Sequence, residues 1–298
     1  MLSISYDSTF DGFLSVVFEV YRQRLQVGEI LPDRAQAQAT DLFMQPFKVE
    51  TSDESARRLK RAIVNAAGLE ILNLLNIVFR SEEAGIEMKM LAYLRKLFAG
   101  IDPNYAKNPT SKEMLPLYMI AQSVRREAGD MLGMVRFDKL SDGTYFAEIE
   151  PKYDIVELMT AHFRGRFANE RWAIYDSKRD YGVYYDGRSA QMVTVPSIEA
   201  VRAGMPPDEL SQLWRDYYNI IAIKERENPK LLRRCLPVRY WKHLTERKGL
   251  QGVSPSVFGA MAGAKTQQIR SKNPQDQPFM VALPSDVAKM NASQRVLA

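Results

Sequence analysis

The sequence predicts an α+β protein from three observations. Apolar residues recur at helical spacing through most of residues 1–132, strand-like alternation begins after residue 133, and Gly, Ser, Pro, Gln and Asn dominate from residue 249. We therefore expect one α+β domain over 1–248, with a helical part (1–132) followed by a part (133–248) that holds an antiparallel sheet with flanking helices. The remaining residues, 249–298, are predicted to form a disordered tail.

Capping residue types mark where the first helices begin. Ser, Thr and Asp at 7–9 precede an amphipathic run that starts at Phe10, and the same types at 51–53 precede a longer helical pattern that continues to Val78. Between them, segment 26–51 contains two prolines and is predicted to be a linker with a short strand or two. Two more helices are predicted over 82–98 and 114–132.

Hairpin signals dominate the second part. Asp142-Gly143 lies between two alternating runs, and 171–175 and 181–185 form a second strand pair followed by Asp186-Gly187. A helix is predicted over 155–163, a strand at 191–195, and short helices from Asn228 and from Leu236. A further helix that begins near Pro206 is predicted to bury one apolar stripe: Leu210, Leu213, Trp214, Tyr217, Ile220 and Ile221.

Composition points to the cytoplasm and to the absence of a resident cofactor. No apolar run approaches the roughly 20 residues that a membrane span needs, so no membrane insertion is expected. The single cysteine, Cys235, cannot form an intramolecular disulfide, which fits a reducing compartment. With only His162 and His243 as further soft ligands, a zinc site or an iron–sulfur cluster is not expected.

Positive charge is concentrated near the end of the predicted domain. The chain has a net charge of +5, whereas 224–248 alone contains nine Lys or Arg and three Glu, so the remainder is about neutral. Lys and Arg attract phosphates, and exposed aromatic rings can stack on unpaired bases. A solvated basic helix with core aromatics is the alternative. The residues predicted to bind nucleic acid are Lys224, Arg226, Lys230, Arg233, Arg234, Arg239, Tyr240, Trp241 and Lys242, together with Arg164, Arg166 and Arg179.

His162 and Asp176 are the candidate catalytic residues. A His and an Asp near several cations could perform acid–base chemistry on a phosphodiester or a base. In the structural alternative, Arg166 and Asp176 form an ion pair, and His162 caps the C-terminus of its helix. The structural interpretation is favoured because no second histidine or carboxylate cluster completes a mechanism, and the sequence leaves open whether the protein is an enzyme.

Three long, non-repetitive motifs are distinctive: HFRGRFANERWAIYDSKRDYGVYYDG from His162, IIAIKERENPKLLRRCLPVRYWKHLTE from Ile220 and YDSTFDGFLSVVFEVY from Tyr6. With them, residues 4 to 248 or so resemble a bacterial family of DNA repair or DNA metabolism proteins associated with a radical-SAM protein. Ser8 stands where that family usually has glycine. Some members continue into a uracil-DNA-glycosylase-like domain, which is not expected in residues 249–298 because they are too few and too polar.

The resemblance implies a DNA-metabolism accessory protein that binds DNA and accompanies a radical-SAM iron–sulfur enzyme. The partner would hold the cluster, since such a cluster needs three closely spaced cysteines. Two alternatives remain open: an enzyme that acts on nucleic acid through His162 and Asp176, and a protein-interaction module that binds no DNA.

Overall fold

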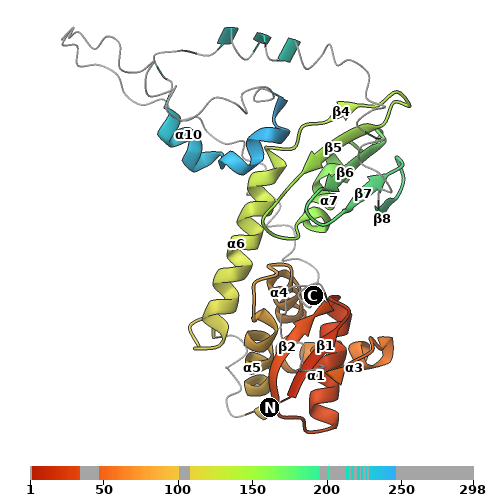
Figure 1. The fold of residues 1–298 in the computed structure, drawn as a ribbon, viewed down its shortest axis with the longest axis vertical. Helices are drawn as coiled ribbons and strands as arrows, with labels where there is room; N and C mark the ends of the chain where they lie inside the picture. The colour runs from red at the N-terminus through yellow and green to blue at the C-terminus, as the bar shows by residue number, and fades with distance from the viewer. Residues whose placement is uncertain are drawn as a thin grey trace, which may run out of the picture. The chain divides into compact units, whose positions relative to one another are not determined.

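Two separate β-sheets surrounded by helices make up the described part of the chain (Figure 1). The computed structural model describes residues 2–33, 47–100, 108–194, 201, 213–214, 216–217, 220–221, 223, 226 and 228–245. Packing divides the chain into Met1–Gln251 and Gly252–Ala298, and every described residue belongs to the first unit. The α+β class is as predicted, and the tail predicted over 249–298 lies outside the described residues.

The first sheet is parallel, with strand order β2-β1-β3. Its strands are β1 (Leu2–Tyr6), β2 (Val27–Pro32) and β3 (Phe47–Lys48), and α1 (Phe10–Arg22) leads from β1 to β2. The helix begins at Phe10 because the Thr9 hydroxyl accepts a hydrogen bond from the Gly12 N–H at 2.9 Å. Strands β2 and β3 agree with the short strands predicted in 26–51, whereas β1 was missed.

Four further helices complete the part predicted to be helical: α3 (Asp53–Ala67), α4 (Leu69–Phe79), α5 (Ile86–Ala99) and α6 (Met114–Leu132). The single long helix predicted to run to Val78 is wrong, because the chain breaks at Gly68. There φ is +91°, a conformation that only glycine adopts without strain, so α3 ends and α4 begins.

The second sheet has the order β4-β5-β6-β7-β8 and is mixed, which corrects the predicted antiparallel sheet. Strands β5 and β6 are parallel because α7 (Val156–Arg166) connects them as a crossover, whereas the other neighbouring pairs are antiparallel. The hairpin predicted at Asp142-Gly143 is confirmed between β4 and β5. The strands are β4 (Asp138–Lys139), β5 (Tyr145–Ile149), β6 (Trp172–Asp176), β7 (Tyr181–Tyr185) and β8 (Ala190–Val193).

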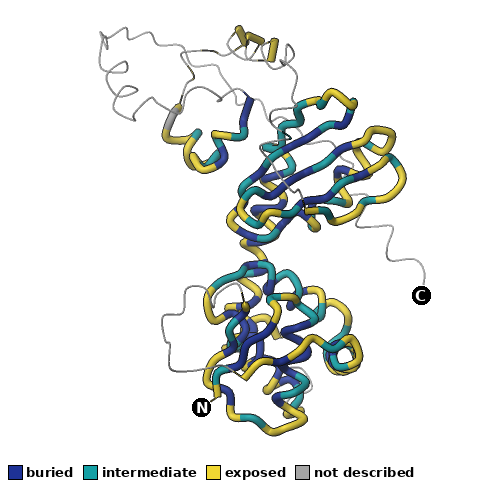
Figure 2. Tube along the Cα trace, turned by 45° about the vertical axis from the view of Figure 1, so that its right-hand side comes forward, coloured by how far each residue is buried: buried dark blue, intermediate teal, exposed yellow. Residues whose placement is uncertain are grey.

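Two apolar cores are buried around these sheets, and α6 contributes to both (Figure 2). Ile77 of α4 and Ile120 of α6 pack against both cores. The long helix is therefore shared along its length. Its N-terminal half places Met114, Leu117 and Ala121 in the first core, and its C-terminal half places Val124, Ala128 and Met131 in the second.

Beyond the second sheet, α10 (Pro229–Cys235) and the 3-10 helix η3 (Val238–His243) confirm the short helices predicted from Asn228 and Leu236. The predicted burial of the stripe over 210–221 is wrong for its described residues. Ile220 is 82% exposed, and Leu213, Trp214, Tyr217 and Ile221 are also exposed. None of the helices that the structure describes has the length and apolar character needed to span a membrane.

We expect Gly182→Ala to lower the free energy of unfolding by about 1–3 kcal/mol, because overpacking a buried site forces backbone shifts. A Cβ at Gly182 of β7 would clash with the Ile174 carbonyl oxygen of the neighbouring strand and lie 3.0 Å from Tyr175 Cα. Gly165→Ala is the matched control, since nothing lies within 4 Å of its added Cβ on α7 and alanine favours the helix by about 0.5–1 kcal/mol. Chemical denaturation checks both, and equal stabilities would contradict the close packing of β6 and β7.

Candidate functional site

The cations of α10 lie together on an exposed face. Asn228 caps this helix by accepting a hydrogen bond from the Leu231 N–H at 3.0 Å. Lys230, Arg233 and Arg234 occupy positions i, i+3 and i+4, so their side chains lie on one face, and all three are exposed. Within the described residues, none of the three forms an ion pair. This face is therefore a concentrated, uncompensated positive charge.

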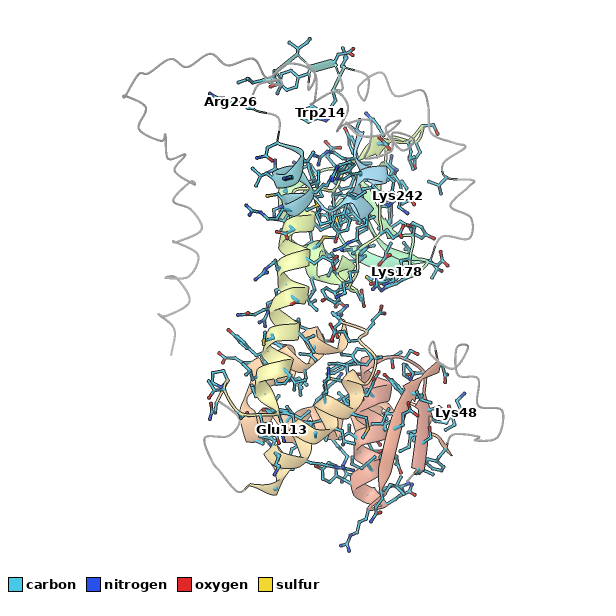
Figure 3. The ribbon with its side chains drawn as sticks, turned by 60° about the vertical axis from the view of Figure 1, so that its left-hand side comes forward. Lys48, Glu113, Lys178, Trp214, Arg226 and Lys242 are labelled. Atoms are coloured by element: carbon cyan, nitrogen blue, oxygen red, sulfur yellow. The ribbon has the colours of Figure 1, made fainter. Side chains whose placement is uncertain are left out.

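The basic and aromatic residues of η3 have a different role. Arg239 donates to Glu127 Oε1 at 3.0 Å and lies 4.6 Å over the Tyr240 ring, and Lys242 pairs with Glu150. Tyr240 is only 4% exposed, so its ring is not open for base stacking. Trp241 donates its indole N–H to the Leu236 carbonyl at 3.0 Å. Arg239, Tyr240 and Lys242 therefore fasten the segment to the body of the protein, whereas the Trp241 bond lies within the segment; Figure 3 labels Lys242.

Glu127 of α6 is the carboxylate to which η3 is fastened. Its side chain is 7% exposed and accepts hydrogen bonds from the Lys152 N–H at 2.9 Å, the Tyr153 N–H at 2.8 Å and the Tyr240 hydroxyl. Burial, followed by this hydrogen bond, raises the pKa of Tyr240, so the phenol remains a donor. The sequence contains a signal that was missed: Glu127 interrupts the apolar positions of α6 beside Val124.

The C-terminal end of α7 exposes a second group of cations. Arg164 and Arg166 are exposed, and the Arg166 guanidinium lies 5.8 Å from the centre of the Phe167 ring. His162 is exposed on the same helix and meets Phe163 edge to face at 5.3 Å. Neither arginine forms an ion pair with a described residue. In particular, the suggested ion pair between Arg166 and Asp176 is not formed.

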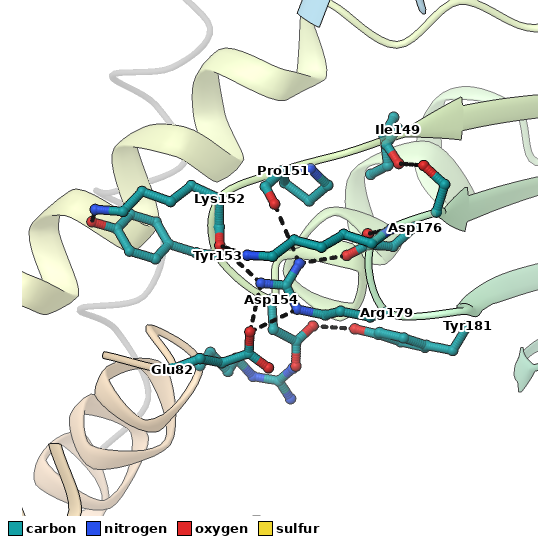
Figure 4. Close-up of polar contacts among 12 residues, drawn as sticks. Glu82, Ile149, Pro151, Lys152, Tyr153, Asp154, Asp176, Arg179 and Tyr181 are labelled. Carbon is teal, nitrogen blue, oxygen red and sulfur yellow. Dashed lines mark hydrogen bonds and ion pairs between the residues drawn. The ribbon is translucent and has the colours of Figure 1, made fainter. Parts of the chain in front are cut away.

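Arg179 is buried in a network of charges at the carboxyl end of β6 (Figure 4). It donates to Asp176 Oδ2 at 2.7 Å, to Glu82 Oε2 at 2.7 and 3.0 Å, and to the Lys152 carbonyl at 2.9 Å. Its side chain is 10% exposed. Arg179 therefore ties the strand end to the chain preceding α5 and is not presented to a ligand, in contrast to its predicted role in nucleic-acid binding.

A second ion pair extends this network. Arg80, which ends α4, donates to Asp154 Oδ2 at 3.1 Å and to Glu157 at the start of α7. Asp154 also accepts the Tyr181 hydroxyl of β7. Burial and the nearby Asp154 carboxylate raise the pKa of Tyr181. The carboxyl ends of β5 and β6 are thus held by interlocking ion pairs, within which the Arg80 Nε–H is buried without a hydrogen-bond partner among the described residues.

His162 and Asp176 do not form a catalytic pair in this arrangement. Asp176 is fully buried and accepts the Lys178 N–H at 2.9 Å as well as Arg179. It ends β6 on the side of the sheet where α7 begins, whereas His162 lies toward the other end of that helix. No hydrogen bond joins these two described side chains.

Another group of polar residues follows the first sheet, where β1 and β3 end. Asp7 accepts hydrogen bonds from the Thr9 N–H at 3.0 Å and from the Thr51 hydroxyl at 2.6 Å. Burial opposes ionisation, but these hydrogen bonds outweigh it and lower the pKa of Asp7. Ser8 has φ of +63°, a backbone conformation that favours glycine. Asp7 thereby links the starts of α1 and α3 internally.

Two of the cations predicted to bind nucleic acid precede α10 in the chain. Lys224 lies outside the described residues, and Arg226 is exposed. Trp214 and Tyr217 are exposed aromatic residues with ring centres 5.7 Å apart (Figure 3 labels Trp214 and Arg226). Of the predicted cations that the structure describes, Arg226, Lys230, Arg233 and Arg234 are exposed near the end of the domain, with Arg164 and Arg166 on α7. Arg239 and Lys242 are exposed as well, but each pairs with a glutamate.

These features define a mixed α+β protein with exposed cationic helices and an internal network of ion pairs. Residues 84–246 match DUF4130, described as a domain of unknown function. Because this match covers more than half of the 298 residues, the chain belongs to the DUF4130 family.

Other comparisons add little. No curated protein matches the chain. A solved DHH domain, described as coming from a member of a family of ribosomal proteins, shares 10% identity with a TM-score of 0.27, over 73% of this chain and 78% of that chain. A likeness this slight carries no argument about fold or function.

We expect Arg179→Ala to lower the free energy of unfolding by about 3–5 kcal/mol, because it leaves two carboxylates without their cation. Arg164→Ala, at an exposed position, is the control, and it should change the free energy of unfolding by no more than about 0.5 kcal/mol.

The loss should also depend on pH. Burial raises the pKa of Asp176, and Arg179 is the largest influence that opposes this shift, so the variant should raise the pKa further although the Lys178 N–H still lowers it. A raised folded-state pKa makes stability fall as pH rises, so the deficit relative to wild type should shrink as pH drops from 7 toward about 4. Denaturation across this pH range measures it, and a deficit that does not vary with pH would contradict this account.

Proposed function

We propose that the protein binds nucleic acid through the exposed cations of α10 and of the C-terminal end of α7. The observation that supports this most directly is the α10 face, where Lys230, Arg233 and Arg234 lie side by side without a described acidic partner. Arg179, Arg239 and Lys242 differ, because each pairs with a carboxylate of the protein itself. The α10 cations have no such carboxylate in the described part of the chain, so their positive charge is available to bind an external anion.

Phosphate is the anion that best suits these side chains. Arginine offers a planar fork of donors that matches phosphate oxygens, and cations that contact a polyanion gain further free energy by releasing its counterions. Arg164 and Arg166 add two such forks on α7. For base stacking we propose the exposed pair Trp214 and Tyr217 in place of Tyr240 and Trp241, which the sequence had suggested.

The resemblance described above supports a narrower proposal: an accessory role in DNA metabolism beside a radical-SAM iron–sulfur enzyme. With Cys235 as the one cysteine in these 298 residues, the cluster would belong to the partner. Exposed apolar side chains also favour a protein-binding role for the described residues of 213–223, because a partner surface would cover them from water. These side chains are Leu213, Trp214, Tyr217, Ile220, Ile221 and Ile223.

We expect the triple variant Lys230→Gln, Arg233→Gln and Arg234→Gln to bind DNA more weakly and with a flatter salt dependence. Each lost phosphate contact reduces the slope of log K against log salt by about 0.9 for duplex DNA. Fluorescence anisotropy with a labelled oligonucleotide of arbitrary sequence, between about 50 and 200 mM salt, measures both quantities.

A matched control removes the same charge elsewhere. Lys89, Arg95 and Lys96 are exposed cations of α5, and their replacement by glutamine should leave binding nearly unchanged. If both triple variants lose affinity equally, net charge rather than the α10 face governs binding. A wild-type protein that binds no DNA at about 50 mM salt would refute the proposal.

A further inference from the structure

Helix α3 has a second exposed basic face, distant in sequence from α10. Its buried side consists of Ala56, Leu59 and Ile63, which pack in the first core. The helix begins at Asp53 because the Ser52 hydroxyl accepts the Ser55 N–H at 3.3 Å. Four cations follow within five positions: Arg57, Arg58, Lys60 and Arg61.

Three of these cations surround an open hollow. Arg57, Arg58 and Arg61 are exposed and, with Glu54, line a hollow of about 420 Å³. Arg57 and Arg58 each lie about one helical turn before Arg61, so both flank it on the exposed side of α3. Lys60 is set apart, because it pairs with Asp11 of α1 at 2.5 Å.

Internal acids compensate this face only weakly. The Arg58 guanidinium and Glu54 carboxylate are 3.9 Å apart, with side chains 64% and 80% exposed, so solvent screens their attraction. Arg57 donates Nε–H to the Asp53 carbonyl at 3.1 Å, which leaves its terminal amino groups available. Arg61 has no ion pair with a described residue. Three arginines thus share one screened carboxylate.

Arg58 is also held in place before any ligand arrives. Its guanidinium lies 5.3 Å from the centre of the Phe18 ring on α1, a cation–π contact that restrains the side chain against the body. The flat face of the guanidinium packs on the ring, whereas its N–H groups lie in the guanidinium plane and can still donate hydrogen bonds to a ligand. Such restraint reduces the entropy lost when the side chain binds an anion.

We propose that Arg57, Arg58 and Arg61 of α3 form a second contact site for the phosphodiester backbone of nucleic acid. An extended polyanion suits this face better than a small phosphate, because the hollow is open and three donor forks spread along one turn of helix. The inference rests on the proposed function and adds a site outside the α10 and α7 cations.

The test compares three triple variants of the full chain in the same anisotropy assay with labelled DNA. They are Arg57→Gln/Arg58→Gln/Arg61→Gln on α3, the α10 triple, and the α5 triple that removes equal charge. We expect the α3 variant to weaken binding several-fold and to reduce the salt slope by roughly 0.9 per lost contact, while the α5 variant binds like wild type. Circular dichroism and thermal unfolding check that each variant is folded.

A second readout uses the wild-type protein and does not depend on folding of the variants. Phenylglyoxal modifies accessible arginines, and peptide mass spectrometry locates the modified sites. DNA should protect Arg57, Arg58 and Arg61 from modification, whereas Arg95 of α5, which is also exposed, should be modified equally with and without DNA.

The outcomes separate this site from the one on α10. Normal binding by the α3 variant, with loss in the α10 variant, would overturn the α3 site and leave the proposed function standing. Loss in the α3 variant alone would support the α3 site and overturn the α10 face. If the wild-type protein bound no nucleic acid, or if an acidic protein protected the α3 arginines where DNA did not, the inference would fail.

Discussion

The carboxylate of Glu127 is buried on α6, and the second half of the domain depends on how that charge is satisfied. An isolated carboxylate in an apolar interior costs several kcal/mol, so it is tolerated only with a full set of donors. Two backbone N–H groups from 152–153 and the side chains of Arg239 and Tyr240 supply them. This requirement fixes the loop after β5 and η3 against one helix, and α10, which immediately precedes η3, is anchored as a result.

Cations in this chain fall into two functional groups that net charge cannot distinguish. Arg179 and Arg80 are nearly enclosed, with side chains 10% and 12% exposed, and each bridges two carboxylates. Removing such a residue would leave charges unpaired, so these arginines hold elements together. Lys230, Arg233 and Arg234 contact no described carboxylate and cost little to leave exposed, which makes them available for recognition.

Local signals predicted much of the fold, whereas long-range pairing escaped sequence reasoning. Asp142-Gly143 indicated its hairpin because a turn with positive φ needs glycine, and Gly143 has φ of +84°. The parallel pairing of β5 with β6 was missed because it depends on α7 crossing over the sheet, and the short run 155–163 was taken only as a flanking helix. Likewise, β1 was missed because it pairs in parallel with β2 and β3, which lie farther along the chain, so that no hairpin turn marks it.

The same limit applies to the candidate site. The clustering of Lys and Arg after residue 224 was visible in the sequence, but the partners that neutralise some of them are far away along the chain. Arg239 meets Glu127 across 112 positions, and Arg179 meets Glu82 across 97. The α3 arginines were overlooked for the opposite reason: nearby acids offset them in a sum of charges along the sequence, whereas in the structure solvent screens the attraction between Arg58 and Glu54.

The position of α6 in both apolar cores has a consequence for how the protein unfolds. If one core unfolded alone, half of α6 would lose its apolar contacts. Ile77 and Ile120 would also become more exposed, although both pack against the core that remained folded. The two halves should therefore lose their structure in a single cooperative transition, with amide protons in α6 exchanging only through global opening. In this respect the two sheets form one thermodynamic unit, although each has its own strands and its own interior.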